Sequence, residues 1–462
     1  MQNDNSTLAQ DIARTIGAEK LVAPADVAGR QLSPAGLTAP ATWMIRPKTT
    51  DDVGKAMQLC HEAGQPVVVV GGATGLAGGL TMTGNEWLLS LESMRGIEID
   101  TGNRVAVVEA GAILQDVQDK AAAAGLSFPI DLGARGSATV GGMIATNAGG
   151  EKAFRFGMMR EQVLGLEVVK ANGERLDLMN RMIKNNTGYD LKQLFIGAEG
   201  TLGIVTRAVL KLRPHLPVRN TGMAAVADYD AAVRLKSAVE EALGNELTAY
   251  EIMWPSLYEV VTRNRAGALP LPLGAGMYVL FEAESGAGRT TDMFVSSMEP
   301  LIEAGMVDDL VLAQSDTERN AMWAIRNNVP AMIAAFMPPV PYDISVPTAE
   351  MGRFVETVES DLLARWPEGR MTAFGHMGDN NVHLVVTLGA DTAAGKDSLN
   401  HMIYDHVGRL GGSISAEHGL GADKRAYLGY CRTPEAIAAM RQLKELFDPK
   451  GLLNPGKVLP AA

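Results

Sequence analysis

The sequence predicts an α+β fold built from two domains. A chain of 462 residues is longer than a typical single domain. Its 47% hydrophobic and 20% charged residues are proportions typical of a globular protein with a sizeable core. Strand-like and helix-like runs are mixed along the whole chain, and neither internal repeats nor low-complexity tracts interrupt them.

Turn residues and the order of elements place the domain boundaries. Residues 1–34 form an N-terminal arm that becomes rich in proline and glycine. We expect a first domain over residues 35–214 and a second over residues 215–400. A C-terminal helical segment, residues 401–462, is expected to return to the first domain.

In the first domain a helix is expected over Thr49–Gly64, with Thr50 or Asp51 as its cap and Gly64 at its end. Val67–Val70 is a short apolar run typical of a buried strand. The other expected elements are strands at Leu88–Leu91 and Asn103–Glu109, a helix at Leu114–Ala124, a strand at Val163–Lys170 that leads into the hairpin signal Asn172-Gly173, and a strand at Arg207–Leu212.

The second domain alternates strand-like and helix-like runs, which predicts an antiparallel sheet with helices on one face. Strands are expected at Met277–Glu282, Tyr342–Val346 and Val382–Thr387, and helices at Asp230–Leu243, Thr317–Phe336 and Thr348–Arg365. Two further helices, His401–Leu410 and Pro434–Leu446, are expected in the C-terminal segment.

Two glycine-rich stretches lie in the first domain, Gly71–Gly79 and Pro129–Gly150. Glycine lets the backbone approach a ligand where a Cβ would clash, and successive N–H groups in such a loop form a nest for anionic oxygens. The stretches therefore suggest a pyrophosphate cradle. Tight turns between strands are the simpler alternative, although the second stretch is long and nearly free of charge.

A strand followed by glycines also invites comparison with a Rossmann dinucleotide site, and Glu92 stands about 20 residues further on, where that fold places an acid. The Rossmann fold needs a helix directly after the glycines. The residues that follow here, GGLTMTGNEW, are poor helix formers. We therefore expect loop N–H groups to hold any phosphate, and a nicotinamide acceptor is disfavoured.

Three of the seven histidines fall in two glycine-flanked motifs. GHMGDNNVH holds His376 and His383, and SAEHGLG holds Glu417 and His418. Two imidazoles and a carboxylate suit zinc or another borderline divalent metal. Asp379 could ligate instead, although a turn residue is the simpler interpretation of it.

The net charge of −12 argues against nucleic acid as the main partner. Only two cysteines are present, and the N-terminal residues lack the apolar core of a signal peptide. No apolar run reaches the roughly 18 residues that a membrane span needs. We therefore expect a cytoplasmic protein, with peripheral association with a membrane left open.

With a third block, Lys184–Thr206, the glycine stretches resemble the FAD-binding domain of the vanillyl-alcohol oxidase and p-cresol methylhydroxylase (PCMH) superfamily. GHMGDNNVH, SAEHGLG and the C-terminal FDPKGLLNPGK resemble its 2-hydroxy acid dehydrogenase branch. DLGARGS and NNTGYDLKQLFIG are most similar to D-2-hydroxyglutarate dehydrogenases, with D-lactate dehydrogenases and the glycolate oxidase flavin subunit as relatives. The resemblance implies a two-domain flavoprotein with a PCMH-type FAD-binding domain and an antiparallel-sheet substrate or cap domain that carries the metal site.

The resemblance implies FAD along the first domain, with the Thr74 hydroxyl adding to the N–H groups around the pyrophosphate. No histidine occurs in the first glycine loop, where some members attach FAD covalently, so non-covalent FAD is expected. The implied cofactor-binding residues are Gly71, Gly72, Ala73, Thr74, Gly75, Leu76, Gly78, Pro129, Asp131, Leu132, Ser137, Thr139, Gly141, Gly142, Ala145, Thr146, Asn147, Gly200, Gly203, Ile204 and Val205.

The resemblance further implies that His376, His383 and Glu417 are metal ligands and that His418 is the catalytic base. Arg326, in MWAIRNN, matches the WxxR pattern of the family and is implied as the clamp for the substrate carboxylate. Arginine suits this task because it is always charged and offers a bidentate fork. The simpler alternative is an arginine on a solvated helix face.

The sequence departs from the hydroxyglutarate enzymes at three positions around these residues. Where those enzymes carry Thr, Lys and Asn, this chain has Pro330, Pro341 and Val385. A second substrate carboxylate would lose polar partners there, and a buried charge without partners is costly. We therefore expect a lactate-like or otherwise less acidic substrate, whose D configuration is implied by the resemblance alone.

The expected function is an FAD- and divalent-metal-dependent dehydrogenase that converts a D-2-hydroxy acid to the 2-oxo acid by hydride transfer to flavin. The alternatives are a D-2-hydroxyglutarate dehydrogenase proper, a non-redox FAD transferase of the alkyl-glycerone-phosphate synthase type, and a non-catalytic binding module. A quinone, a cytochrome or an electron-transfer flavoprotein is the expected electron acceptor. A homodimer is expected only because many soluble enzymes form one.

Overall fold

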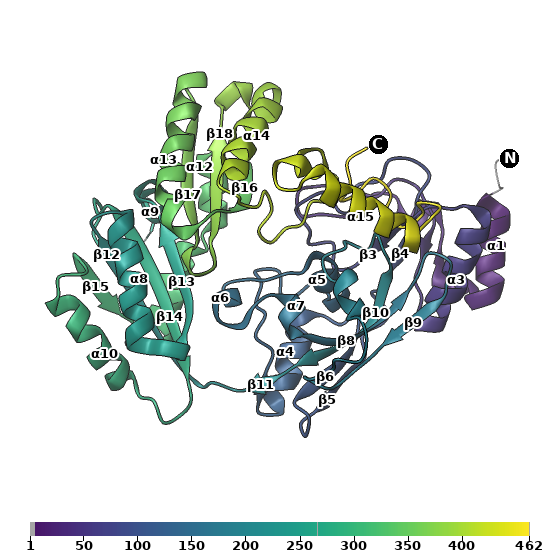
Figure 1. Cartoon of the computed structure of the whole chain (residues 1–462), viewed down its shortest axis with the longest axis horizontal. Coiled ribbons are helices and arrows are strands. Elements are labelled where there is room, and N and C mark those ends of the chain that lie inside the picture. Colours follow the sequence, from purple (N-terminus) through teal and green to yellow (C-terminus); the bar gives the residue numbers. More distant parts are fainter. Residues whose placement is uncertain (1–4, 266, 462) are drawn as a thin grey trace. The chain divides into compact units, whose positions relative to one another are not determined.

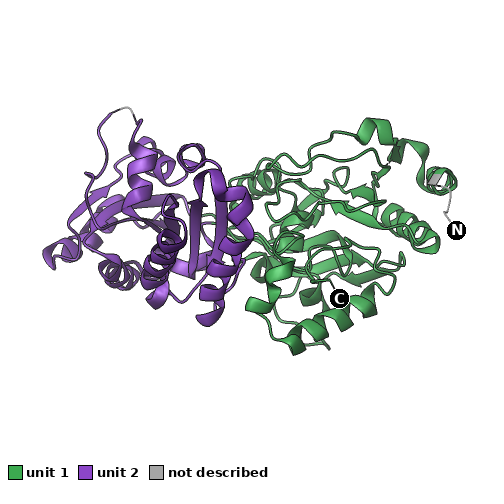
Figure 2. Cartoon of the chain, turned by 90° about the horizontal axis from the view of Figure 1, so that it is seen from above, with its two compact units in different colours: residues 1–150, 157–215, 417–462 green, residues 151–156, 216–416 purple. Residues whose placement is uncertain are grey.

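The computed structural model describes residues 5–265 and 267–461, so the first four residues of the predicted arm lie outside it. The chain divides into two compact units (Figures 1 and 2). Unit 1 comprises residues 1–150, 157–215 and 417–462, and unit 2 comprises residues 151–156 and 216–416. The predicted boundary at residue 400 falls inside a continuous helix of unit 2, Thr392–Arg409 (α14).

Unit 1 contains two main sheets. The first has the strand order β1-β2-β4-β3, in which β2, β4 and β3 run parallel. The second is antiparallel, with the order β5-β6-β10-β8-β9, and a short ladder pairs β7 with β11. Their bounds are β1 (Leu21–Val22), β2 (Met44–Ile45), β3 (Val67–Val70), β4 (Trp87–Ser90), β5 (Ile97–Asp100), β6 (Val105–Glu109), β7 (Leu126–Ser127), β8 (Val163–Val169), β9 (Arg175–Leu178), β10 (Ile204–Lys211) and β11 (Arg213–Pro214).

The helix predicted over Thr49–Gly64 is confirmed as α3, except for the residue that caps it. Thr49, not Thr50 or Asp51, caps α3: its hydroxyl accepts from the Asp52 N–H, and the Asp52 carboxylate accepts from the Thr49 N–H. Gly64 ends the helix in a left-handed conformation. The helices of unit 1 are α1 (Asn5–Ile16), α2 (Pro24–Val27), α3 (Thr50–Ala63), α4 (Leu114–Ala123), α5 (Val140–Thr146), α7 (Met159–Gln162) and α15 (Pro434–Phe447).

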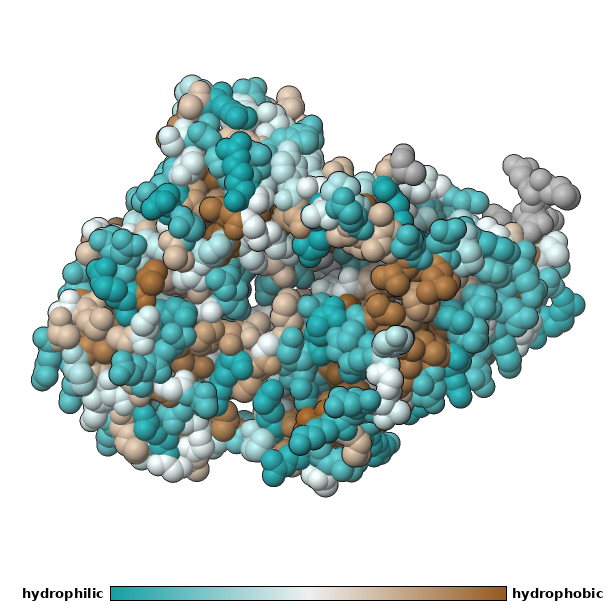
Figure 3. Space-filling view, viewed as in Figure 1, coloured by the Kyte–Doolittle hydropathy of each residue, from teal (hydrophilic) through white to brown (hydrophobic). Residues whose placement is uncertain are grey.

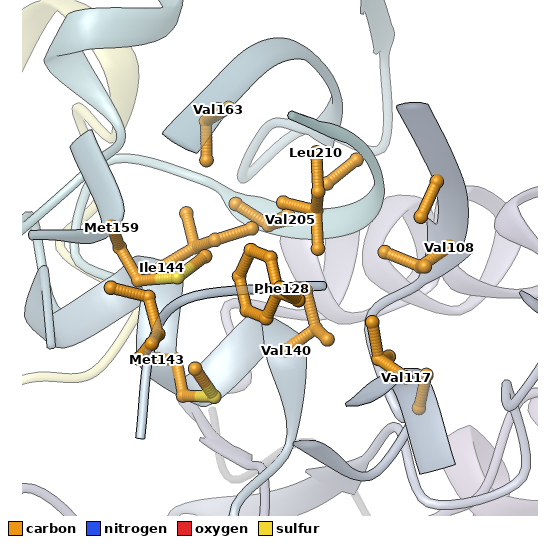
Figure 4. Close-up of a cluster of buried hydrophobic side chains, with 14 of the residues drawn as sticks. Val108, Val117, Phe128, Val140, Met143, Ile144, Met159, Val163, Val205 and Leu210 are labelled. Atoms are coloured by element: carbon orange, nitrogen blue, oxygen red, sulfur yellow. The ribbon is translucent and has the colours of Figure 1, made fainter. Parts of the chain in front are cut away.

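The glycine-rich stretch Pro129–Gly150 contains the short helix α5, which the sequence pattern does not predict. Thr139 caps this helix, and Asn147 ends it in a left-handed conformation. Its apolar side chains Val140, Met143 and Ile144 pack around Phe128 together with side chains of β6, β8 and β10 (Figure 4). The hydrophobic core of unit 1 therefore anchors this stretch on the five-stranded sheet.

Unit 2 is built on a seven-stranded antiparallel sheet with the order β15-β12-β14-β13-β17-β18-β16. The strands are β12 (Val218–Val226), β13 (Leu247–Met253), β14 (Met277–Ser285), β15 (Asp309–Leu312), β16 (Val340–Ser345), β17 (Arg370–His376) and β18 (Asn381–Thr387). The helices are α6 (Ala153–Phe156), α8 (Tyr229–Leu243), α9 (Pro255–Thr262), α10 (Thr291–Glu303), α11 (Asp316–Arg326), α12 (Val329–Ala335), α13 (Thr348–Arg365) and α14.

Helices cover both faces of this sheet, so the prediction of helices on one face is wrong. On one face, Tyr250 donates to a carbonyl of α8 and Phe281 contacts Phe294 of α10. On the other face, Met253 and Leu280 pack with side chains of α9, α11 and α12. The reason is that the central strands β13 and β14 are buried along nearly their whole length, on both sides.

The single helix predicted over Thr317–Phe336 is also wrong, because two asparagines divide it. Asn327 ends α11, and the Asn328 side chain accepts from the Ala331 N–H to cap α12. Pro330 occupies the first turn of α12, where its missing N–H has no helical partner to lose.

The face shown in Figure 3 is mainly hydrophilic, with hydrophobic residues gathered in a few places. Over the described residues, every helix falls short of the length or the apolar character that a bilayer span requires.

Candidate functional site

The two glycine-rich stretches pack directly against each other in unit 1. The Gly71–Gly79 loop joins β3 to β4 without an intervening helix, as predicted. A Cβ added at Gly72 would lie 2.1 Å from the carbonyl oxygen of Ser137, and one at Gly71 would lie 2.7 Å from the Thr139 hydroxyl oxygen. Close approach of the two loops therefore requires glycine at these two positions.

Other glycines of the same loops border open space. A Cβ added at Gly75, Gly133 or Gly136 would meet no protein atom within 4 Å. Protein packing therefore does not explain why these positions lack side chains, whereas a ligand in contact with the backbone would explain it. We call this pair of glycine-lined loops the glycine cradle, whose backbone N–H groups are candidates for contact with a pyrophosphate.

Several polar side chains predicted to bind the cofactor are engaged in holding the second loop together. The Thr146 hydroxyl donates to the Gly142 carbonyl at 3.1 Å. The Asn147 amide oxygen accepts from the Arg160 N–H at 2.9 Å. These contacts hold the backbone of the second loop in place.

The third block meets the cradle through α5. The N–H groups of Gly197 and Glu199 donate to the carbonyls of Ile144 and Ala145 at 2.9 and 2.8 Å. Gly200 follows in a left-handed conformation. Of the remaining predicted residues, Gly203 packs against Val168 and Phe195, and Ile204 and Val205 are buried at the start of β10.

The motif SAEHGLG is anchored in unit 1 by both neighbouring blocks. The Gly150 N–H donates to Oε1 of Glu417 at 2.8 Å. Glu199 accepts from the N–H groups of Leu420 and Gly421 at 2.7 and 2.8 Å. Burial raises the pKa of Glu199 even though these two hydrogen bonds act against the shift. The residues on either side of His418 are therefore held at the glycine cradle.

The two histidines of the first motif lie on one face of the sheet in unit 2. His376 is the last residue of β17, and His383 lies on β18, beyond the turn η4 (Met377–Asp379) that contains Asp379. The ring centroids are 5.3 Å apart and the ring planes are inclined by 83°. Two imidazoles this close can share one divalent ion.

A buried glutamate that the sequence analysis missed organises the residues around His376. Glu251 lies on β13 as the register partner of His376. Its Oε1 lies 2.7 Å from His376 Nδ1, and its Oε2 accepts from Arg326 Nε at 2.9 Å. Burial alone would raise the pKa of Glu251, but the Arg326 charge, His376 and both hydrogen bonds outweigh burial and lower it.

Arg326 is buried at the end of α11, so the solvated-face alternative is wrong. Its Nη1 donates to Asn327 Oδ1 at 3.1 Å, and its Nη2 lies 3.3 Å from His376 Nε2. The guanidinium carbon lies 5.1 Å from the centre of the Phe374 ring. Since Nε alone faces Glu251, N–H groups on the two Nη atoms are left for a ligand carboxylate.

A backbone hydrogen bond connects the strand next to His383 with the residue before Glu417. Asp343 is the register partner of His383 on the neighbouring strand β16, and its carbonyl accepts from the Ala416 N–H at 3.3 Å. Glu417 is the next residue in the sequence.

The three departures from the hydroxyglutarate pattern differ in their surroundings. Val385 is 8% exposed and belongs to the apolar cluster that contains Phe374. Pro341 is its register partner on the edge strand β16. Pro330 is exposed in the first turn of α12. Val385 and Pro341 thus present an apolar pair on the strands that neighbour Arg326 and the histidines.

Two family models match the chain. The model described as "FAD linked oxidases, C-terminal domain" matches residues 216–458, and the model "FAD binding domain" matches residues 41–179. The chain belongs to the FAD-linked oxidase family. The predicted FAD-binding domain is confirmed, and the glycine cradle of unit 1 lies mostly within the matched residues.

This FAD-linked oxidase is 37% identical over 421 residues to the mitochondrial D-2-hydroxyglutarate dehydrogenase of Bos taurus, with 90% of this chain and 76% of that protein covered. The similarity confirms the predicted FAD-dependent oxidoreductase of the class that acts on CH–OH donors.

Two solved structures share the fold. A p-cresol methylhydroxylase with substrate bound has a TM-score of 0.72 at 14% identity and covers 99% of this chain and 97% of its own. An alkyldihydroxyacetonephosphate synthase has a TM-score of 0.72 at 16% identity, with 97% of this chain and 85% of its own covered. The predicted fold class is confirmed; at these identities the structures say nothing of the reaction.

In this member of the family, sequence reasoning missed three residues that support the site: Glu251, Glu199 and Asn454. The one signal for Glu251 is a lone acid inside the strand-like run LTAYEIM, which a buried strand tolerates only when partners bind the carboxylate. Glu199 and Asn454 offer a different signal, since both have left-handed backbones without being glycine.

Proposed function

We propose that this FAD-linked oxidase is a divalent-metal-dependent dehydrogenase of D-2-hydroxy acids whose side chain is apolar or only weakly polar. The observation that carries the proposal is the polar cluster on one face of the sheet in unit 2. There, Arg326 lies beside His376, His383 neighbours His376, and an apolar wall that includes Val385 borders them.

Each group of the cluster has a task in this reaction. His376, His383 and Glu417 would hold zinc or another divalent ion, and the glycine cradle would hold FAD. When bound, the ion supplies a Lewis acid for the substrate hydroxyl and FAD supplies the acceptor for the hydride from Cα. The free N–H groups of Arg326 bind the substrate carboxylate.

His418 takes the hydroxyl proton. An imidazole suits this task because a ring nitrogen can accept the proton in one step and release it in the next. The proton goes to His418 and the hydride to flavin, which leaves the 2-oxo acid as product.

The apolar wall supports a substrate without a second carboxylate. Val385 and Pro341 stand opposite each other, and Phe374 lies between Arg326 and His383, with its ring centre 4.9 Å from the His383 ring centre. A second carboxylate against Val385 and Phe374 would be desolvated, and the Thr372 hydroxyl next to Val385 is already hydrogen-bonded with Ser256. D-2-hydroxyglutarate remains the alternative substrate, because the relative with 37% identity is named for it.

A non-redox FAD transferase is the other alternative, since a synthase of that kind shares the fold. The buried Arg326, which suits a substrate carboxylate, and the motifs shared with the 2-hydroxy acid branch argue against a transferase and favour oxidation.

The test is anaerobic mixing of the purified yellow protein with a panel of D-2-hydroxy acids, monitored by flavin absorbance. We expect bleaching by D-lactate or a related apolar acid, and its loss in His418→Asn. His401→Asn is the matched control, because His401 is 54% exposed on α14. Faster reduction by D-2-hydroxyglutarate than by D-lactate would overturn the substrate assignment, and no bleaching by any acid would overturn the dehydrogenase.

Metal removal tests a separate part of the proposal. The expected ligands His376 and His383 lie in unit 2, whereas the FAD cradle lies in unit 1. Dialysis against a chelator should therefore abolish flavin bleaching while the protein stays yellow, and added zinc should restore bleaching. Full activity in the metal-free protein would contradict the metal dependence.

Two further properties follow from the same site. FAD should be bound without a covalent bond, because the loop GGATGLAGG offers neither His nor Cys for attachment, and acid precipitation should therefore release all of the flavin. Reoxidation of the reduced flavin should be faster with a quinone, a cytochrome or an electron-transfer flavoprotein than with an oxidised nicotinamide.

A further inference from the structure

Glu251 connects two residues to which the proposed function gives different tasks. One carboxylate oxygen bonds Nδ1 of His376, a metal ligand in the proposal, and the other bonds Nε of Arg326, the carboxylate clamp. Glu251 is completely buried, and the side chains of Arg326 and His376 are only 8% and 7% exposed. Its two bonds are therefore shielded from water and from competing ions.

The contact with His376 determines which imidazole nitrogen carries the ring proton. An ionised carboxylate only accepts hydrogen bonds, so Nδ1 of His376 must carry the ring proton. Nε2 then keeps its lone pair, and it is the nitrogen atom that a metal ion would bind. Such a carboxylate behind a ligand histidine fixes both the tautomer and the orientation of the ring.

The contact with Arg326 determines where the guanidinium points. Glu251 holds Nε, and Asn327 at the end of α11 takes one N–H of Nη1. The guanidinium plane is thereby fixed, with Nη2 next to the ring of His376. A planar fork held at two points loses little freedom when it binds a carboxylate.

Sheet register explains why one residue can reach both groups. Glu251 on β13 stands directly opposite His376 on β17, and α11 packs on the same face of the sheet. The partners are separated from Glu251 by 125 and 75 residues in the sequence. We propose that Glu251 is a positioning residue that sets the metal ligand His376 and the substrate clamp Arg326 in one fixed arrangement. This inference rests on the proposed function.

Glu251→Gln tests the inference because an amide has one acceptor and one donor end. If its oxygen faces His376, its NH₂ group opposes the Arg326 Nε–H. If its oxygen faces Arg326, its NH₂ group donates to Nδ1, and the ring proton moves to Nε2, where it blocks the metal. The first orientation breaks the contact with Arg326 and the second reverses the hydrogen bond with His376, and in both the side-chain volume is almost unchanged.

Glu282→Gln is the matched control. Glu282 is another buried glutamate of the same sheet, on the neighbouring strand β14, and its Oε2 accepts from Thr221 and from Trp323, both at 2.9 Å. It touches neither His376 nor Arg326 in any contact described for it. A general effect of removing a buried charge from this sheet would appear in both variants.

The first measurement is zinc affinity of the metal-free, FAD-loaded full chain, by competition with a chromophoric chelator and without turnover. We expect Glu251→Gln to bind zinc roughly 10- to 100-fold more weakly than the wild type. Glu282→Gln should bind zinc as the wild type does, and His376→Ala should lose tight binding.

The outcomes separate the two proposals. Unchanged zinc affinity in Glu251→Gln, together with loss in His376→Ala, overturns the positioning role and leaves the proposed metal site standing. Unchanged affinity in His376→Ala overturns the metal site and this inference with it. Equal losses in Glu251→Gln and Glu282→Gln assign the effect to the sheet as a whole and overturn the inference.

The tautomer of His376 is a second measurement. A merely structural role of Glu251 would leave this tautomer unchanged. The chain has seven histidines, and ¹⁵N labelling of them alone, with His376→Ala for assignment, shows which ring nitrogen carries the proton. We expect the Nδ1–H form in the wild type and in Glu282→Gln. A wild-type Nε2–H form in the metal-free protein would overturn the inference.

Discussion

At the scale of single residues, Arg326 shows what a buried arginine can do that a lysine cannot. Its guanidinium faces Glu251 with Nε, Asn327 with Nη1 and the His376 ring with Nη2. An ammonium is a point charge on a flexible stem and cannot hold several partners in one plane. The clamp role therefore depends on geometry as well as on charge.

Arg326→Lys should lower kcat/KM for the preferred D-2-hydroxy acid by roughly 10- to 150-fold, because a hydrogen bond to a charged group is worth about 1.5–3 kcal/mol. Steady-state kinetics with an artificial electron acceptor measures this change. Arg319→Lys is the control on the same helix, since Arg319 pairs only with Asp316 among the ion pairs described. Equal kinetics of Arg326→Lys and the wild type would remove Arg326 from substrate binding.

Val385→Asn should move substrate preference toward acids with a polar side chain. It places an amide in the apolar cluster beside Phe374, where a polar substrate group could pair with it. We expect the kcat/KM ratio of D-2-hydroxyglutarate over D-lactate to rise by about tenfold, one hydrogen bond being worth about 1 kcal/mol or somewhat more.

The matched variant for this change is Val385→Leu, whose side chain has the same γ-branched shape as asparagine without its amide. An equal rise of the ratio in both variants would show that space, not polarity, determines the preference. Thermal unfolding of the metal-free protein should show a cost for Val385→Asn about 1–3 kcal/mol larger than for Val385→Leu, because the amide is buried beside Phe374 and the neighbouring Thr372 hydroxyl is already bonded to Ser256.

Residues that share a motif could be predicted from the sequence, and residues that meet through register could not. His376 and His383 stand seven positions apart around a turn, so their proximity follows from the chain. Glu251 reaches His376 only because β13 pairs with β17, and no local pattern determines that pairing. The depth at which Arg326 is buried likewise depends on how α11 packs on the sheet.

At the scale of elements, strands and caps follow local rules, whereas helix breaks depend on side-chain competition. Val67–Val70 and Thr348–Arg365 form the predicted strand and helix with the predicted bounds. The break between α11 and α12 arises because Asn328 offers its side chain to a backbone N–H, an alternative to continuing the helix. The sequence pattern does not predict helix α5 because its glycines are poor helix formers. Tertiary packing around Phe128 stabilises this helix.

The two glycine loops allow an element-scale prediction that separates packing from ligand binding. Gly72→Ala should destabilise the FAD-free protein, because the new Cβ would meet the Ser137 carbonyl oxygen at 2.1 Å. Gly75→Ala should leave the FAD-free protein as stable as the wild type, since nothing lies within 4 Å of its Cβ. FAD affinity of Gly75→Ala should nevertheless fall by about tenfold or more, the equivalent of about 1.4 kcal/mol.

Thermal unfolding of the FAD-free protein and FAD titration by flavin fluorescence measure the two effects. Gly84→Ala is the control, because Gly84 also borders open space but lies outside the nine-residue cradle loop Gly71–Gly79. If Gly75→Ala and Gly84→Ala bind FAD equally well, the first loop does not contact the cofactor.

At the scale of the whole molecule, unit 1 is assembled from three separate parts of the chain. The C-terminal family match runs through residues 216–458, yet residues 417–462 belong to unit 1 with the FAD cradle. The tail adds a backbone bridge to β3, where Val67 pairs with Leu453. Sequence patterns locate such a tail as a motif, but its docking place depends on a strand almost 400 residues earlier in the chain.

Asn454 is the residue through which this tail holds the FAD site together. Its amide oxygen accepts from the Val69 N–H at 2.8 Å, directly before the first glycine loop, and its NH₂ group donates to the Glu199 carbonyl at 2.6 Å in the third block. Asn454 also adopts a left-handed backbone, at φ 44°. One side chain thus joins the tail to two of the three parts of the cradle.

Asn454→Gly should weaken FAD binding and lower the thermal stability of the FAD-free protein by about 1–3 kcal/mol, because it leaves a buried N–H without its partner. Glycine keeps the left-handed backbone free of strain, so the loss reports the side chain alone. Asn454→Asp should lie between the wild type and Asn454→Gly, since a carboxylate still accepts from the Val69 N–H but no longer donates to Glu199. Flavin retained after gel filtration and unfolding followed by circular dichroism measure the two effects, and wild-type behaviour of Asn454→Gly would show that backbone pairing at Leu453 alone docks the tail.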